Sequence, residues 1–190
     1  MSTKKSFQVY YLLISEGTTE FNIFAYLTRN KFRSLFDTSD IKFSLKVEIV
    51  ELGISQGKLD GVSDIKQFGI KYTSIREKYG GQRRFFVLDK DLDDSSAIEN
   101  LIKQNNDVVQ FLEYNSEFLL LKFSCKNPKN PSEFENLSAF RTYCKSEFDR
   151  HFGKKTSDLK DADFDLIFAS ASDDEIKSAF SELFSTLNTQ

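Results

Sequence analysis

The chain has 190 residues, a formal net charge of −3 and 39% hydrophobic residues. This length suits one domain with a substantial core, and the apolar content excludes a largely disordered chain and a typical membrane protein. The net charge excludes a global basic field, so a nucleic-acid partner would need a local basic patch or phosphates bridged by metal.

The first predicted element is a strand over Phe7–Ser15, an almost continuous apolar run of the kind that is covered on both faces. The run is too short to span a membrane, and "EGTTE" follows it where a signal peptide would carry a small-residue cleavage site. The two cysteines, Cys125 and Cys144, fit no CxxC zinc pattern. These features predict a cytoplasmic protein with reduced thiols and no membrane contact.

Helical and extended patterns alternate through the next hundred residues. In chain order they predict a helix from Thr18 or Thr19 to about Phe32, a strand over Lys42–Leu52, a helix over Val62–Lys78, a strand over Arg84–Asp89, a helix from Ser95 or Ser96 to Asn105 and a short strand over Val108–Leu112. Such alternation is typical of an open, mainly parallel α/β sheet flanked by helices.

The C-terminal part is predicted to be helical. "NSEFLLLKF" is apolar, "CKNPKNPSE" holds both prolines and marks a break, and Glu133–Phe152 and Ser172–Leu187 have helical periodicity. We expect an α/β core over residues 1–124 and a helical extension over residues 125–190 packed on the same domain. With 20 Phe and no Trp, the core should be rich in phenylalanine.

Acidic residues follow two of the predicted strands. Glu16 ends the first strand, and Asp89, Asp91 and Asp93 lie at the end of the third. Functional groups gather at the carboxyl ends of parallel strands, and residues two apart in an extended segment point to one side. Glu16, Asp89 and Asp91 would then face one point, where a divalent cation, Mg²⁺ or Mn²⁺, would relieve their mutual repulsion.

Other interpretations of "DKDLDD" compete with metal binding. The run also suits a solvated turn that caps the following helix. An EF-hand loop is rejected because Asp94 and Asn100 stand where Gly and Glu are required. A phosphatase of the haloacid-dehalogenase type fits poorly, because two βα units precede the Asp-x-Asp pair.

The two acidic motifs together resemble the Toprim domain of topoisomerases, primases and OLD-type nucleases. "LLISEGTTEFNIFAYL" and "FFVLDKDLDD" are similar to the opening strand and the Asp-x-Asp strand of the RloB/AbiL-type group of bacterial Toprim-like proteins. "YNSEFLLLKF" is similar to their "NPxFExWLLLHF" segment, although Glu117 precedes Phe118 and Lys122 replaces the histidine. The resemblance covers roughly Gln8 to Phe123 and leaves the role of Glu117 open.

This resemblance implies a Toprim-like (Rossmannoid) fold and a metal-dependent nuclease acting on DNA or RNA in bacterial anti-phage defence, beside an ABC-type ATPase partner. Asp89 and Asp91 would be the Mg²⁺ ligands, and Glu16 the general acid/base or a metal-linked carboxylate. Asp93 would be a further acidic position. The alternative is a non-catalytic partner-binding or sensor module of a defence complex, docking a partner through its phenylalanine-rich C-terminal helices.

Three lysines are candidates for weak nucleic-acid contacts. Lys58 lies in the loop "GISQGKLDG", and Lys122 and Lys126 follow the fourth strand. The loop matches no P-loop pattern, so a simple strand-to-helix turn is the competing interpretation. His151 is the single histidine, and a water activated by metal would need no histidine base. The sequence gives no oligomeric state and allows a homodimer.

Overall fold

The computed structural model describes residues 9–29, 35, 41–44, 65–90, 94–124 and 126–188. The strands of this described part are β1 (Val9–Ser15), β2 (Ile41–Ser44), β3 (Arg83–Asp89) and β4 (Val108–Leu112). Its helices are α1 (Thr18–Arg29), α3 (Ile65–Lys78), α4 (Ser95–Lys103), α5 (Ser116–Phe123), α6 (Leu137–Phe152), α7 (Asp161–Ile167), α8 (Asp173–Ala179) and α9 (Ser181–Asn188), with short 3-10 helices η1 (Pro131–Glu133) and η2 (Thr156–Asp158).

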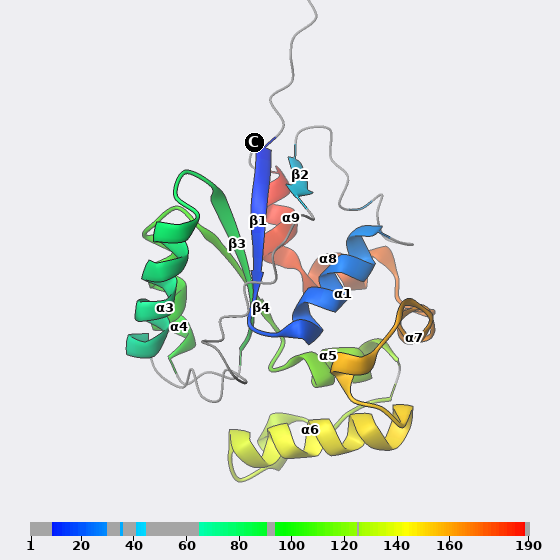
Figure 1. Ribbon diagram of the computed structural model, residues 1–190. Coiled ribbons are helices and arrows are strands. Elements are labelled where there is room, and N and C mark those ends of the chain that lie inside the picture. Colours follow the sequence, from blue (N-terminus) through cyan, green and yellow to red (C-terminus); the bar gives the residue numbers. More distant parts are fainter. Residues whose placement is uncertain are drawn as a thin grey trace, which may run out of the picture.

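The four described strands form one sheet in the order β2-β1-β3-β4, and all three neighbouring pairs are parallel. Helices flank this sheet on both sides (Figure 1). The expected α/β fold with a parallel sheet is therefore confirmed. The predicted second strand ran from Lys42 to Leu52, and only its first three residues lie among the described residues, within β2 (Ile41–Ser44).

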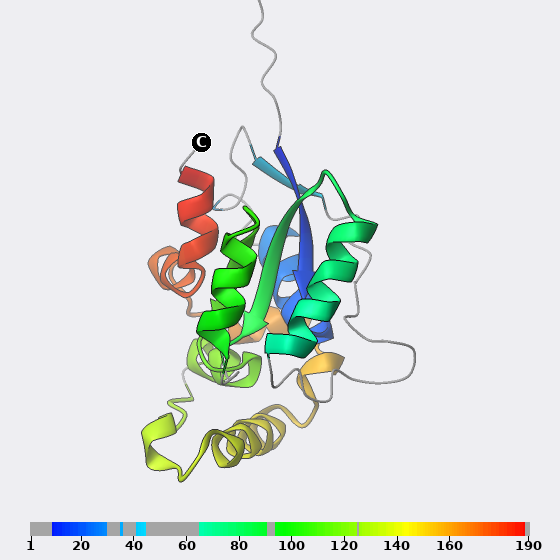
Figure 2. The ribbon, with the colours of Figure 1, turned by 90° about the vertical axis from the view of Figure 1, so that its left-hand side faces the viewer.

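Each face of the sheet has its own hydrophobic core, because successive residues of a strand point to opposite faces. Leu13 and Phe85 pack with α1 and the C-terminal helices, whereas Leu12, Ile14 and Phe86 pack with α3 and α4. Figures 1 and 2 show α3 and α4 together on one side, with α1, α8 and α9 on the other. The core is rich in phenylalanine, as the composition predicted.

The segment predicted as one C-terminal helix is divided into α8 and α9 at Phe180. The carboxamide of Gln110 on β4 bonds both sides of the break: its Nε2 donates to the Ala179 carbonyl at 3.3 Å, and its Oε1 accepts from the Glu182 N–H at 3.0 Å. Phe180 is fully buried. The helix stops here because its freed backbone groups find partners on the edge strand.

A buried ion pair closes the amino end of β3. Arg84 Nε donates to both carboxylate oxygens of Asp107, at 3.0 and 2.8 Å, and the Tyr72 hydroxyl donates to the same carboxylate at 2.7 Å. Burial raises the pKa of Tyr72, and the hydrogen bond to the Asp107 carboxylate raises it further. Arg84 therefore serves the fold at the end of the strand opposite the aspartates.

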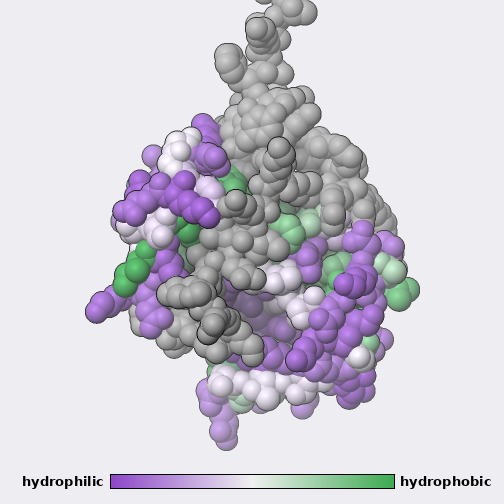
Figure 3. Space-filling model, viewed as in Figure 1, coloured by the Kyte–Doolittle hydropathy of each residue, from purple (hydrophilic) through white to green (hydrophobic). Residues whose placement is uncertain are grey.

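The described surface is mainly hydrophilic in the view of Figure 3, with scattered hydrophobic residues. Among the described residues, Ile70 and Leu166 are the exposed large hydrophobic side chains, and they lie on different helices, α3 and α7. Phe140, Phe148 and Phe180 of the C-terminal helices are fully buried. These three rings serve the core. None of the described helices is long and apolar enough to cross a membrane.

Candidate acidic site at the carboxyl end of the sheet

The ends of β1 and β3 meet at the carboxyl edge of the sheet. Ser15 pairs with Val87 in parallel register, and the Glu16 N–H continues this ladder by donating to the Val87 carbonyl at 3.1 Å. The Asp89 backbone N–H in turn donates to Glu16 Oε2 at 3.3 Å. The two acidic residues that end separate strands are thus in direct contact.

Two aspartates of the predicted site, Asp91 and Asp93, lie outside the described residues, as does Lys58. Within the described ranges, no three His, Cys, Asp or Glu side chains form a group that could hold a metal ion. Glu16 and Asp89 are therefore the two expected ligands whose placement the structure gives.

Asp94 anchors the start of α4 in an unexpected way. It occupies the N-cap position of that helix, but its side chain makes no capping hydrogen bond to α4. Its carboxylate instead accepts from the Ile65 N–H at 2.9 Å, at the first residue of α3. The acidic run thus joins the two helices on one side of the sheet.

Glu20, which the sequence analysis did not select, is buried beside this edge. The residue is 6% exposed. Burial raises the pKa of its carboxyl group, hydrogen bonds from the Ser116 side chain and from backbone groups lower it, and the nearby charge of Glu117 raises it further. The carboxylate folds back over Gly17, where an added Cβ would lie 3.0 Å from Glu20 Oε2. Glycine at this position therefore leaves room for the acid.

Glu117 enters the same region from the start of α5. Asn115 caps that helix, since its side chain accepts from the Phe118 N–H at 2.8 Å. The cap places Glu117 in the first turn, where its Oε1 accepts from the Thr156 hydroxyl at 3.2 Å. Thr156 also contacts the Thr19 hydroxyl at 3.2 Å. We call the carboxyl edge of the sheet, where Glu16, Glu20, Asp89 and Glu117 lie, the acidic edge. The C-terminal extension therefore contributes Thr156 as a contact of this edge.

Two of the candidate lysines, Lys122 and Lys126, lie in the part of the chain that the structure describes. Lys122 forms an ion pair with Glu113, with Nζ 2.6 Å from Oε2, and its Nζ lies 5.6 Å from the Phe118 ring centre. Lys126 is exposed just beyond α5. Lys122 is thus engaged with a neighbouring acid, which weakens it as a phosphate contact.

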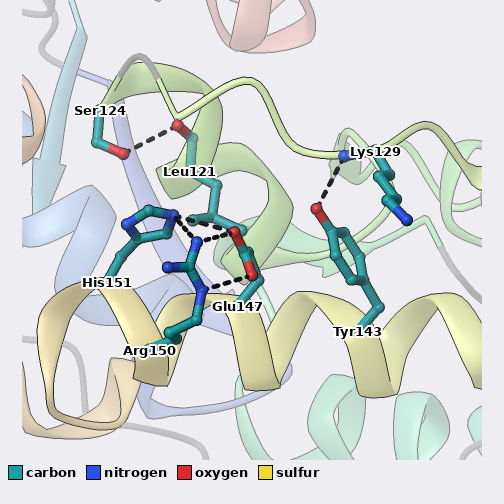
Figure 4. A network of polar contacts seen from close by, with 7 residues as sticks. All are labelled: Leu121, Ser124, Lys129, Tyr143, Glu147, Arg150 and His151. Atoms are coloured by element: carbon teal, nitrogen blue, oxygen red, sulfur yellow. Dashed lines mark hydrogen bonds and ion pairs between the residues drawn. The ribbon is translucent and has the colours of Figure 1, made fainter.

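His151 belongs to a polar network on α6. Its Nε2 lies 3.0 Å from Glu147 Oε1 and 2.8 Å from an Arg150 nitrogen, as Figure 4 shows. Hydrogen bonding by Arg150, with a smaller contribution from His151, lowers the pKa of Glu147 to about 2. The polar partners of His151 shown in Figure 4 therefore lie on its own helix, α6.

A sequence signal for the missed Glu20 exists in retrospect, and Glu117, whose role the sequence left open, carries the same signal. Glu20 lies four residues after Glu16, at the third position of α1, and Glu117 is the second residue of α5 directly after β4. Both helices start at the carboxyl edge of a parallel sheet, where functional residues concentrate. An acid in the first helical turn after such a strand is thus a candidate on position alone.

No protein-family model matches the chain, and no match was found among curated proteins or among solved structures.

Proposed function

We propose that the acidic edge is the active site of a Toprim-like, divalent-metal-dependent nuclease that hydrolyses phosphodiesters of DNA or RNA. The observation that carries the proposal is the hydrogen bond from the Asp89 N–H to Glu16 Oε2. It joins the ends of β1 and β3, which hold the two motifs that resemble the RloB/AbiL-type group. Separated motifs that converge on one point support a shared chemical role.

The donor set fits Mg²⁺ or Mn²⁺, because both ions prefer oxygen ligands and leave positions for water and phosphate oxygens. Glu16 and Asp89 would hold the ion together with Asp91, and Asp93 would be a further acidic position. The raised pKa of Glu20 is consistent with this fit, because it marks an edge where negative charge is poorly solvated. A bound ion would lower the pKa of a water molecule and neutralise charge on the scissile phosphate.

Side chains of this protein would orient the attacking water molecule and transfer protons to or from it. The hydrogen bond from the Asp89 N–H fixes one oxygen of Glu16, which supports a role for that carboxylate as a general acid/base or as a metal-linked group. Glu20 keeps its proton to a higher pH than an ordinary glutamate, because it is buried. A neutral Glu20 would limit repulsion between this edge and the phosphate.

The biological setting follows from the resemblance alone. Proteins of the RloB/AbiL type imply a role in anti-phage defence beside an ABC-type ATPase partner, and both are part of this proposal. The alternative, a non-catalytic module of such a complex, would keep the fold and the partner without hydrolysis.

The test is a cleavage assay with labelled single-stranded, double-stranded and structured DNA and RNA, in Mg²⁺, Mn²⁺ or EDTA. The variants are Glu16→Gln and Asp89→Asn, which remove one charge each with little change in shape. Asp174→Asn, at an exposed position on α8, is the matched control.

We expect metal-dependent cleavage that falls by about 100-fold or more in both edge variants, in line with losses from removing an essential acid or base, and that survives in Asp174→Asn. Cleavage that persists unchanged in Glu16→Gln and Asp89→Asn would refute the proposal. Binding of a co-purifying ATPase with no cleavage of any substrate would favour the non-catalytic module.

A further inference from the structure

Thr156 is a buried polar residue of the C-terminal extension that lies against the acidic edge. It is the first residue of η2 and is 6% exposed. Its two side-chain partners, Thr19 and Glu117, are 137 and 39 residues away in sequence. One hydroxyl therefore links three segments: the first turn of α1, the first turn of α5 and η2.

The direction of these hydrogen bonds follows from their chemistry. An ionised carboxylate only accepts, and a threonine hydroxyl has one hydrogen to donate. The Thr156 hydroxyl donates to Glu117 Oε1, and the Thr19 hydroxyl donates to the Thr156 oxygen, each at 3.2 Å. Hydrogen bonds in such a chain polarise and strengthen one another.

The orientation of Glu117 affects the rest of the edge. Glu117 is half-buried, and its charge contributes to the raised pKa of the buried Glu20. A glutamate side chain has several rotamers of similar energy unless a partner selects one. Thr156 is that partner on the Oε1 side, so it fixes where the negative charge of Glu117 lies relative to Glu20.

We propose that Thr156 is a positioning residue through which the C-terminal extension fixes the Glu117 carboxylate at the acidic edge. The structural part of this proposal concerns only the Thr156–Glu117 contact. The consequence for catalysis depends on the proposed nuclease function. On this view the extension is part of the site, and the α/β core alone would not reproduce it.

The experiment uses the whole 190-residue chain and three variants of it. Thr156→Val has nearly the same shape but no hydroxyl, and Thr156→Ser restores the donor with a smaller side chain. Thr142→Val is the matched control. Thr142 is exposed on α6, and its hydroxyl donates to the Ser138 carbonyl of its own helix. Circular dichroism checks that each variant folds.

The first measurement needs neither metal nor substrate. The side-chain carboxyl ¹³C resonance of Glu117 is recorded by NMR in EDTA and assigned with a Glu117→Gln variant. We expect this resonance to shift in Thr156→Val, to return toward its wild-type position in Thr156→Ser and to be unchanged in Thr142→Val. An unchanged resonance in folded Thr156→Val would overturn the proposal whether or not the protein is a nuclease.

The second measurement tests the consequence for the site. In the cleavage assay, Thr156→Val should lower kcat by about 10- to 100-fold, because a misplaced charge beside the reacting groups is costly, with a smaller effect on KM and recovery in Thr156→Ser. Full activity in Thr156→Val would refute the catalytic part. If the Glu117 resonance shifts but the wild-type protein neither cleaves nor binds Mn²⁺, the positioning role stands and the proposed function fails.

Discussion

Replacing the buried acid Glu20 with glutamine should make the protein more stable at neutral pH. Glu20 is 6% exposed, and loss of solvation is the largest cause of its raised pKa. Glutamine has nearly the same shape, cannot ionise and keeps a side-chain oxygen that can accept from Ser116. The substitution therefore removes a buried charge at little steric cost.

The sign of the pH dependence follows from proton linkage. The folded state holds the Glu20 proton more tightly than the unfolded state, whose pKa is near 4.5. The wild type therefore loses stability as pH rises from about 4.5 through the folded pKa, and above that value the full penalty remains. Glu20→Gln has no such loss, so its advantage should be absent near pH 4 and should grow as the pH rises.

The magnitude is about 1.4 kcal/mol for each pH unit by which burial raises the pKa. For a chain of this size each kcal/mol corresponds to about 2–4 °C in Tm. The assay is urea unfolding in EDTA between pH 4 and pH 8, with the exposed Glu135→Gln as the control. The reasoning is refuted if Glu20→Gln is less stable than the wild type at pH 8, or if its stability difference does not change with pH.

Two further predictions concern ion pairs away from the acidic edge. Asp107→Asn should lower the free energy of unfolding, measured in urea, by about 3–5 kcal/mol. The substitution leaves the buried Arg84 guanidinium without its charged partner and weakens the hydrogen bond from Tyr72. A loss below about 1 kcal/mol would contradict this prediction. Glu147 has a pKa near 2 beside Arg150, so its contribution is present above about pH 4.5 and lost as pH falls toward 2. Because Arg150 is exposed, Glu147→Gln should cost only about 1 kcal/mol at pH 7, and a cost that persists at pH 2 would exclude the ion pair as its cause.

The sheet could be predicted because its signals are local. Apolar runs bounded by turns located β1, β3 and β4 to within two residues, and the alternation with helices predicted parallel pairing. The rule that functional residues follow strands at their carboxyl ends then led to Glu16 and Asp89. Their contact required β1 and β3 to be neighbours, which the order of the sheet provides.

The features that sequence reasoning missed depend on contacts between distant segments. Helical periodicity runs through Phe180 without interruption, and the break there reflects partners on Gln110 of β4. Glu20 follows two threonines that suggest a helix cap, and its hydrogen bond with Ser116 comes from another element. Lys122 looks like a free cation in the sequence, whereas the structure pairs it with Glu113 nine residues earlier.

Binding of Mn²⁺ to the protein, measured by isothermal titration calorimetry, tests most directly whether the ends of β1 and β3 form one cation site. The wild type and Asp174→Asn should bind the ion alike, and Glu16→Gln and Asp89→Asn should each weaken binding by about tenfold or more, a loss of at least 1.4 kcal/mol. Equal Mn²⁺ affinity in all four proteins would contradict the account.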